Sequence, residues 1–165
     1  MERTRVIDPR ETDLEEWSQG SLYGGRDARL GSLLGLKHLG IGYSEVPPGK
    51  SGCPFHNHHV EDELFIILEG EGTYRIGKER HAVRAGHILG APAGGPDTAH
   101  QLINTGSGPL RYVVVSTKAL TEICEYPDSG KFLAKTLDPE TGQYRFNQMV
   151  SEADSIDYWQ GEPGA

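Results

Sequence analysis

The chain has 165 residues, of which 36% are hydrophobic, 24% are charged and 22 are glycines. This length and composition suit one globular domain and exclude collagen-like, coiled-coil and wholly disordered proteins. The net charge of −8 argues against partners such as nucleic acid or an anionic membrane surface.

Residues 1–41 are predicted to form an N-terminal arm that opens with a short helix. Asp8 can cap this helix, Pro9 suits its first position, and Glu11 can complete a capping box. Leu14 and Trp17 would form its buried side. The first residues lack the apolar core of a secretory signal. The segment 31–42 mixes Leu with Gly and fits either a strand or a loop.

From Tyr43 onward, short apolar or alternating runs recur at intervals of roughly 8–12 residues. No helical period separates them, so the pattern predicts an all-β sandwich or barrel. The runs cover residues 53–58, 63–69, 72–76, 80–84, 87–91, 99–104 and 110–116. After Thr117 the strand pattern stops, and residues 118–165 are predicted to be a tail with a turn at 126–130 and a weak helix start at 151–154.

The run 63–69 is apolar on both faces. Phe65 and Ile67 lie on the face of Glu63 and should line the interior, whereas Leu64, Ile66 and Leu68 face the other way. The run 110–116 has the same two-sided character. Such an outer face must be covered by the arm, the tail or a second subunit. Because C2 dimers are the commonest oligomers, we expect a homodimer.

The most informative residues are two histidines that are two positions apart. On a strand His56 and His58 point the same way, and His59 points away from them. Neutral imidazoles are the commonest protein ligands for transition metals, so this pair predicts a metal site. Replacing His58 should lower metal occupancy, replacing His59 should not, and metal should be lost as the pH falls through the histidine range.

A third ligand is expected from the next strand. Glu63 opens that strand, and an antiparallel return would set its carboxylate opposite the histidine pair. Glu61 and Asp62 are rivals, but they lie in the turn. A fourth candidate is His100, which shares a strand face with Leu102 and Asn104. Three imidazoles and one carboxylate would bind a divalent metal and leave open positions for a substrate.

These residues resemble the two sequence motifs of the cupin superfamily. The first motif reads His56-x-His58, four residues, Glu63, six residues, Gly70. The second reads Gly86, five residues, Pro92-x-Gly94, a gap, His100, three residues, Asn104. Two departures from the family pattern are a displaced glycine before His56 and a longer loop between Gly94 and His100.

The resemblance implies a cupin double-stranded β-helix, a jelly-roll-like barrel with short helical or irregular extensions at both ends. The barrel core would span 42–117 within one domain of residues 1–165. The implied cofactor is a divalent transition metal such as zinc, iron, manganese or nickel, held by His56, His58, Glu63 and His100. The chain is also similar to small bacterial cupins that are described as sugar-phosphate isomerases.

The remaining reactive residues receive less specific roles. Four histidines without matching partners are expected at the surface or in turns: His38, His59, His81 and His87. Cys53 should be a small buried residue that faces away from the ligands, and Cys124 lies in the tail with no nearby histidine. Four cations in the strand region are available for a phosphate: Arg75, Lys78, Arg84 and Arg111. No general acid or base can be assigned.

Two classes of function remain open. The first is a metalloenzyme acting on a small organic molecule, such as a sugar-phosphate isomerase, a dioxygenase or a decarboxylase. The second is a non-enzymatic module that binds a small ligand. The sequence has no helix-turn-helix signature, and its longest apolar run, 64–68, is too short to cross a membrane. With only two cysteines and no signal core, the protein is expected in the cytoplasm.

Overall fold

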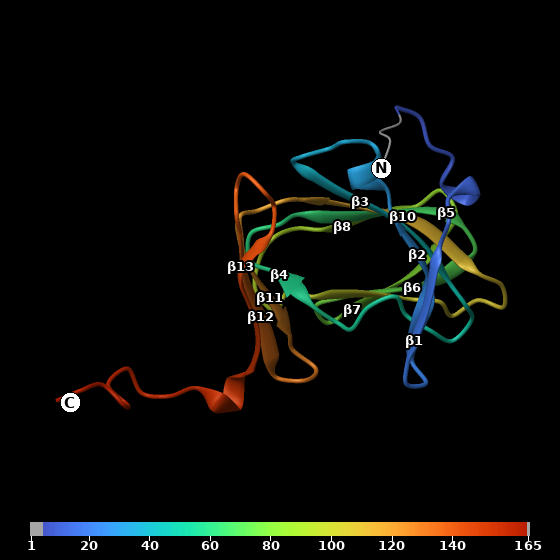
Figure 1. Cartoon of the computed structure of the whole chain (residues 1–165). Coiled ribbons are helices and arrows are strands. Elements are labelled where there is room, and N and C mark those ends of the chain that lie inside the picture. The colour runs from blue at the N-terminus through green and yellow to red at the C-terminus, as the bar shows by residue number, and fades with distance from the viewer. Residues whose placement is uncertain (1–4, 165) are drawn as a thin grey trace.

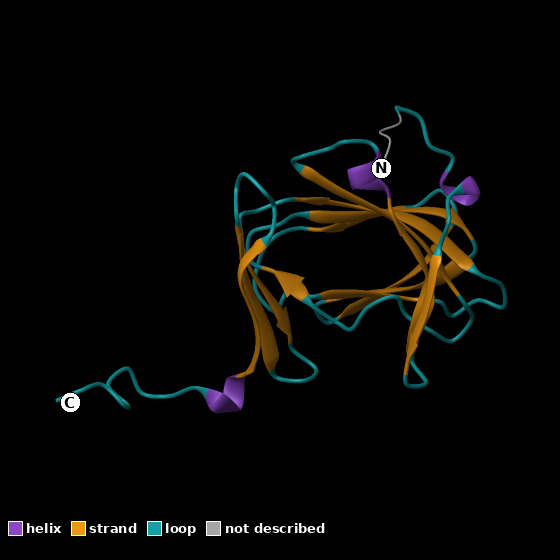
Figure 2. Ribbon diagram, viewed as in Figure 1, coloured by secondary structure: helices purple, strands orange, loops and turns teal. Residues whose placement is uncertain are grey.

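The computed structural model describes residues 5–164; residues 1–4 and 165, which belong to the predicted arm and tail, lie outside this range. The structure is built mainly from strands (Figures 1 and 2). In chain order its elements are η1 (Pro9–Glu11), β1 (Glu15–Gln19), β2 (Tyr23–Arg29), α1 (Leu30–Leu33), β3 (Leu39–Val46), β4 (Asn57–His58), β5 (Glu63–Glu69), β6 (Glu71–Ile76), β7 (Glu79–Arg84), β8 (Ile88–Ala91), β9 (His100–Ile103), β10 (Leu110–Thr117), β11 (Thr121–Tyr126), β12 (Lys131–Leu137), β13 (Tyr144–Ser151) and η2 (Glu152–Asp154).

Two layers of strands face each other across the interior (Figure 1). One layer is a sheet in the order β1-β2-β3-β10-β5-β8. The other combines the sheets β7-β6-β9 and β13-β12-β11-β4, which are joined by isolated bridges from Ser51 to Ile103 and from His56 to His100. Each predicted strand run of the barrel corresponds to one of the strands β4 to β10, so the predicted all-β barrel architecture is confirmed.

The interior is filled by inward-facing residues of both layers. Phe65 and Ile67 are buried, as their position on the Glu63 face predicts. They belong to a core cluster whose other members are Val46, Tyr74, Val83, Leu89, Ala91, Leu102, Leu110 and Tyr112. Burial of each large apolar side chain stabilises the fold by about 1.5–3 kcal/mol before entropic costs.

The two motif residues at strand ends have structural roles. Gly70 joins β5 to β6 with φ +84°, and a Cβ there would clash with the carbonyl oxygen of Pro109. Asn104 is fully buried at the end of β9, and its Nδ2 donates to the carbonyl oxygens of Val46 and Gly108 at 2.7 and 2.9 Å. Gly70 and Asn104 therefore fix the turns that close the barrel, and these contacts are with the backbone and not with the predicted metal ligands.

The N-terminal arm differs from its prediction. Asp8 does cap a helix, but this is the three-residue η1, and the Asp8 side chain accepts from the backbone N–H of Arg10. Residues 15–19 form strand β1 because they pair with β2, and the indole of Trp17 donates to Asp27 across that hairpin. The segment 31–42 contains both the end of α1 and the start of β3. Pairing in the sheet thus takes the place of the predicted helix beyond η1.

The tail prediction is wrong over residues 121–151, which form the hairpins β11-β12 and β12-β13. The turn at 126–130 and the short helix capped by Ser151 are confirmed. The alternation in β11 was hidden because two of its buried residues are Glu122 and Cys124, which are not strongly apolar. The last residues run away from the barrel past β13 (Figure 1).

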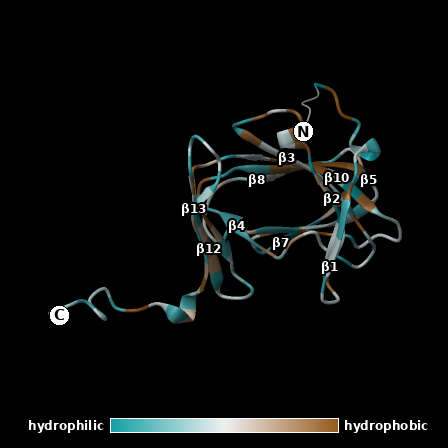
Figure 3. Ribbon diagram, viewed as in Figure 1, coloured by the Kyte–Doolittle hydropathy of each residue, from teal (hydrophilic) through white to brown (hydrophobic). Residues whose placement is uncertain are grey.

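The outer face of the β10 side is covered within the chain. Tyr43, Ala28 and Leu30 form a second cluster against which Leu14, Val113 and other residues of the arm and β10 pack. Further along the same sheet, Leu68 on β5 and Ile88 on β8 remain 45% and 69% exposed. Figure 3 shows hydrophobic residues on β5 and β10. Among residues 5–164 there is no helix of the length and apolarity needed to cross a membrane.

Candidate metal centre

Two of the predicted ligands meet on one layer of the barrel. His56 and His100 form an antiparallel bridge in which each backbone N–H donates to the other residue's carbonyl, at 3.1 and 2.7 Å. Residues directly opposite each other in such a bridge present their side chains on the same face. The two imidazole centroids are accordingly 4.5 Å apart, inside the barrel.

Glu63 reaches this pair from the opposite layer. Its Oε2 lies 2.9 Å from Nε2 of His100 and 3.8 Å from Nε2 of His56. The predicted antiparallel return next to the histidine strand is wrong, because β5 pairs with β10 and β8 and not with β4. The carboxylate instead crosses the interior, and the structure brings His56, Glu63 and His100 within 4.8 Å of one another.

His58 shares the inward face with His56 but lies further from the centre. Its ring centroid is 5.0 Å from that of His56 and 6.2 Å from that of His100. Its Nδ1 is buried and has no hydrogen-bond partner among the described residues; the Glu61 carboxylate is 3.9 Å away. A buried imidazole nitrogen with free bonding capacity is costly in the metal-free state and suits a ligand role.

The two rival carboxylates have partners of their own, although Glu61 also groups with His58 and Glu122. Glu61 accepts hydrogen bonds from the backbone N–H of Ala119 at 2.9 Å and from the Lys135 ammonium at 3.3 Å. Asp62 accepts from the backbone N–H of Ala93 at 2.9 Å. Of the three acids in this segment, Glu63 is therefore the one that contacts the histidine pair, as its position on the strand indicates.

The electrostatics favour a neutral set of imidazoles. Burial lowers the pKa of His56 to about 4, and burial also lowers the pKa of His58. Burial by itself would raise the pKa of Glu63, but the hydrogen bond with His100 and the nearby imidazoles outweigh it, so that pKa is lowered. At neutral pH His56 and His58 are therefore unprotonated beside a carboxylate, which is the state in which they can bind a metal.

Three further residues of the site come from β11, where the sequence predicted no strand. Glu122, Cys124 and Tyr126 alternate along β11, which pairs with β4 so that Cys124 lies opposite His58. The expectation that Cys124 has no nearby histidine is therefore wrong. The period-two spacing of these three residues was the available signal. Tyr126 stacks on His56 with 6.1 Å between ring centroids.

Glu122 holds the turn that connects the two halves of the first motif. Its carboxylate accepts from three successive backbone N–H groups, those of His59, Val60 and Glu61, at 2.8, 3.2 and 2.7 Å. The side chain is almost fully buried. Glu122 thus fixes the backbone between His58 and Glu63.

The other histidines lie away from the centre. His59 points outward, is 39% exposed at its side chain and lies 3.0 Å from the Glu125 carboxylate. His81 lies 3.0 Å from Glu79 on the exposed side of β7, and His38 is exposed. His87 is partly buried in the turn before β8.

The predicted phosphate-binding cations are not gathered around the histidines. Arg111 pairs with Glu45 and Glu69, and Lys78 and Arg84 are exposed. Arg75 pairs with Asp128 of the β11–β12 turn, and its guanidinium lies 3.5 Å from the ring centre of Phe55, the neighbour of His56. A cation that the sequence did not single out, Lys131, lies 5.3 Å from the ring centre of Tyr126.

Known proteins share this fold. A structure from Acidithiobacillus ferrooxidans, provisionally described as a sugar phosphate isomerase, superposes with a TM-score of 0.74 at 24% identity over 90% of both chains. A sugar phosphate isomerase from Silicibacter pomeroyi superposes with a TM-score of 0.69 at 25% identity, over 79% of this chain and 78% of that one.

Curated relatives match over a shorter stretch. Auxin-binding protein 1 of Arabidopsis thaliana is 33% identical over 106 residues, which are 59% of this chain and 52% of the relative. The oxalate-binding protein of Thermotoga maritima is 31% identical over 71 residues, 43% of this chain and 55% of the relative. The chain thus spans about half the length of these relatives. The model of the cupin domain family matches residues 42–116. Residues 42–116 therefore resemble a cupin domain, and the chain has the cupin fold.

Proposed function

We propose that the protein binds one divalent transition metal through His56, His58, Glu63 and His100. The observation that carries this proposal is the convergence of His56, Glu63 and His100 from two opposed layers to within 4.8 Å. The residues fit such an ion, because burial keeps His56 and His58 neutral and the buried Nδ1 of His58 lacks a partner among the described residues. Nitrogen donors with one carboxylate suit zinc, iron, manganese or nickel.

We further propose that the protein is an enzyme that acts on a small organic molecule, with a sugar phosphate as the leading substrate. The metal, when bound, would act as a Lewis acid toward a carbonyl or hydroxyl oxygen. Glu63 and His100 would hold each other in place through their 2.9 Å contact. The two solved structures described as sugar phosphate isomerases support this substrate class. Lys131, beside the Tyr126 ring that stacks on His56, is a cation that could bind the phosphate group.

The test begins with metal analysis of protein purified without added metals. We expect close to one transition metal per chain, followed by interconversion of aldose and ketose phosphates in a substrate screen that includes oxygen uptake. Metal content that is negligible, and that cannot be raised by adding zinc, iron, manganese or nickel, would overturn the metal site. A loaded protein that turns over no sugar phosphate would overturn the substrate class.

A second candidate is a cupin that binds a small carboxylate, or oxidises or decarboxylates it. The match to the oxalate-binding protein of Thermotoga maritima favours it. Calorimetric titration of the metal-loaded protein with oxalate, alongside carbon dioxide release and oxygen uptake, separates the options. Binding without turnover points to a non-enzymatic module, whereas carbon dioxide release points to a decarboxylase.

We also propose that the protein is a cytoplasmic homodimer. The apolar face near Leu68 and Ile88 supports association, because exposed aliphatic side chains that adjoin on one sheet are typical of an interaction surface. Cys53 and Cys124 are both free, which suits a reducing compartment.

A further inference from the structure

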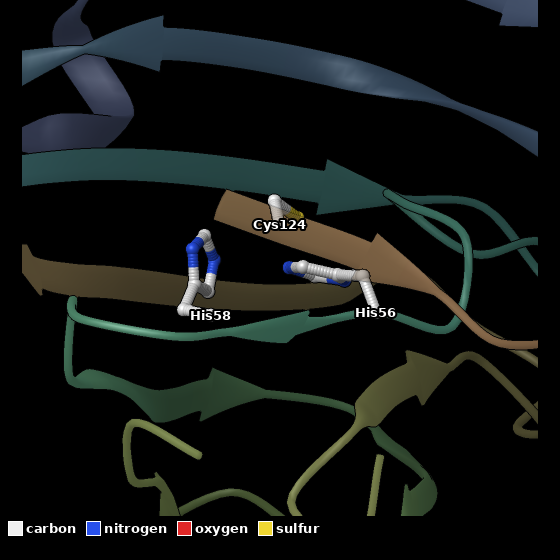
Figure 4. A group of neighbouring side chains, drawn as sticks. All are labelled: His56, His58 and Cys124. Atoms are coloured by element: carbon white, nitrogen blue, oxygen red, sulfur yellow. The ribbon is translucent and has the colours of Figure 1, made fainter. Parts of the chain in front are cut away.

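Cys124 lies directly beside the histidine pair. In the β4–β11 ladder it is the register partner of His58, so the two side chains project from the same face of the sheet. His56 shares that face by the two-residue period of the strand. One ligand atom from each of His56, His58 and Cys124 lies within 4.8 Å of the other two (Figure 4).

The surroundings of the thiol are those of the site and not of the apolar core. Cys124 is 4% exposed and does not belong to either cluster of packed apolar residues. Tyr126, which stacks on His56, follows Cys124 by two residues on the same face of β11. His58, the register partner of Cys124, has a buried Nδ1 that lacks a hydrogen-bond partner among residues 5–164 and lies 3.9 Å from the Glu61 carboxylate.

The distances are compatible with a shared ion. Ligand atoms around one tetrahedral zinc are about 3.5 Å apart, given Zn–N and Zn–S bonds of about 2.1 and 2.3 Å. Separations of up to 4.8 Å therefore need a contraction of at most about 1.3 Å, which calls for rotation of the imidazole and thiol side chains on binding. His56 belongs both to this group and to the group with Glu63 and His100, so the two groups adjoin at His56.

We propose that Cys124 is a further ligand of the metal, on the side of His56 and His58 that faces β11. This inference rests on the proposed metal site. On binding, the thiol releases its proton to solvent and the thiolate sulfur donates an electron pair to the ion. Because thiolate is a soft donor, its participation selects zinc and cobalt(II) over manganese(II).

Cobalt(II) is the probe that distinguishes a sulfur ligand from a purely nitrogen and oxygen set. A thiolate bound to cobalt gives an intense near-ultraviolet charge-transfer band, whereas imidazole and carboxylate ligands give only the weaker visible bands. The chain has two cysteines, and of these only Cys124 belongs to a candidate metal group among the described residues. Cys53→Ser is therefore the matched control for Cys124→Ser.

We expect cobalt-loaded wild type and Cys53→Ser to show the near-ultraviolet band, and Cys124→Ser to lose it while keeping the visible bands. Zinc affinity of Cys124→Ser should fall at least about tenfold, with a smaller change for manganese. Visible cobalt bands without the near-ultraviolet band in wild type would overturn the role of Cys124 and leave the four-ligand site standing. Absence of any cobalt binding would overturn the metal site itself. If Cys124→Ser does not fold, the band in Cys53→Ser still decides, since Cys124 is then the one remaining thiol.

Discussion

Oε2 of Glu63 and Nε2 of His100 are 2.9 Å apart although their strands belong to opposite layers of the barrel. This contact ties β5 to β9 across the interior without any backbone pairing between them. The site is therefore formed only when both layers are packed, and its geometry reports on the integrity of the barrel.

The first prediction compares two neighbouring histidines. His58→Ala should weaken metal binding at least about tenfold, because it removes an inward imidazole beside His56. His59→Ala should leave metal content nearly unchanged, because that ring points outward toward Glu125. Metal content after dialysis checks both variants. Loss of metal in His59→Ala and retention in His58→Ala would contradict the assigned strand faces.

The second prediction concerns pH. The pKa of His56 is lowered from 6.5 to about 4 by burial, so the unfolded chain binds the proton more readily than the folded chain. The metal-free protein should therefore be most stable above pH 6.5 and lose stability as the pH falls toward 4, by on the order of 3 kcal/mol from this group. The lowered pKa of Glu63 acts in the same direction.

Urea denaturation of the metal-free protein between pH 7.5 and 4.5 measures this dependence. The variant His81→Ala is the control, because His81 is exposed on β7 and contributes no buried imidazole. A midpoint that does not change over this range would show that His56 is not held neutral by burial. At His56, protons should therefore compete with the metal near pH 4, below the ordinary histidine value of 6.5.

The third prediction concerns the amide at the end of β9. Asn104→Ala should lower the free energy of unfolding by about 2–3 kcal/mol, because it leaves the carbonyls of Val46 and Gly108 without their donor in a buried setting. Asn147→Ala on the exposed β13 should change it by less than about 0.5 kcal/mol. Thermal denaturation of the metal-free proteins checks the pair, and equal losses would contradict a specific role for Asn104.

The fourth prediction tests the proposed dimer. Light scattering at micromolar concentration should give twice the chain mass of 18.1 kDa. Ile88→Asp should shift the mass toward the monomer, because it places a charge on the exposed apolar face of β8. Leu22→Asp, at an exposed position in the β1–β2 turn, is the control. A wild-type mass near that of one chain would end the dimer proposal.

The sequence was sufficient to predict the barrel and the inward set of His56, Glu63 and His100. Residue types with strict spacing carried that information, since a two-residue period places side chains on one face. The layer from which Glu63 reaches the histidines could not be predicted, because it depends on which strands pair with β5. Likewise β11 could not be recognised from apolar alternation, because its inward residues Glu122 and Cys124 are polar or weakly apolar; the pairing of Cys124 opposite His58 reveals its place.

The carboxylate of Glu122 binds three consecutive backbone N–H groups of the segment that separates His58 from Glu63. The four ligands proposed from the two motifs lie between residues 56 and 100, and the cupin family match ends at 116, yet this anion is supplied from residue 122. The shortest stretch that contains these four ligands is therefore not the shortest stretch that can preorganise them. A change in the segment beyond residue 116 can thus tune the affinity of the site while these four ligands stay the same.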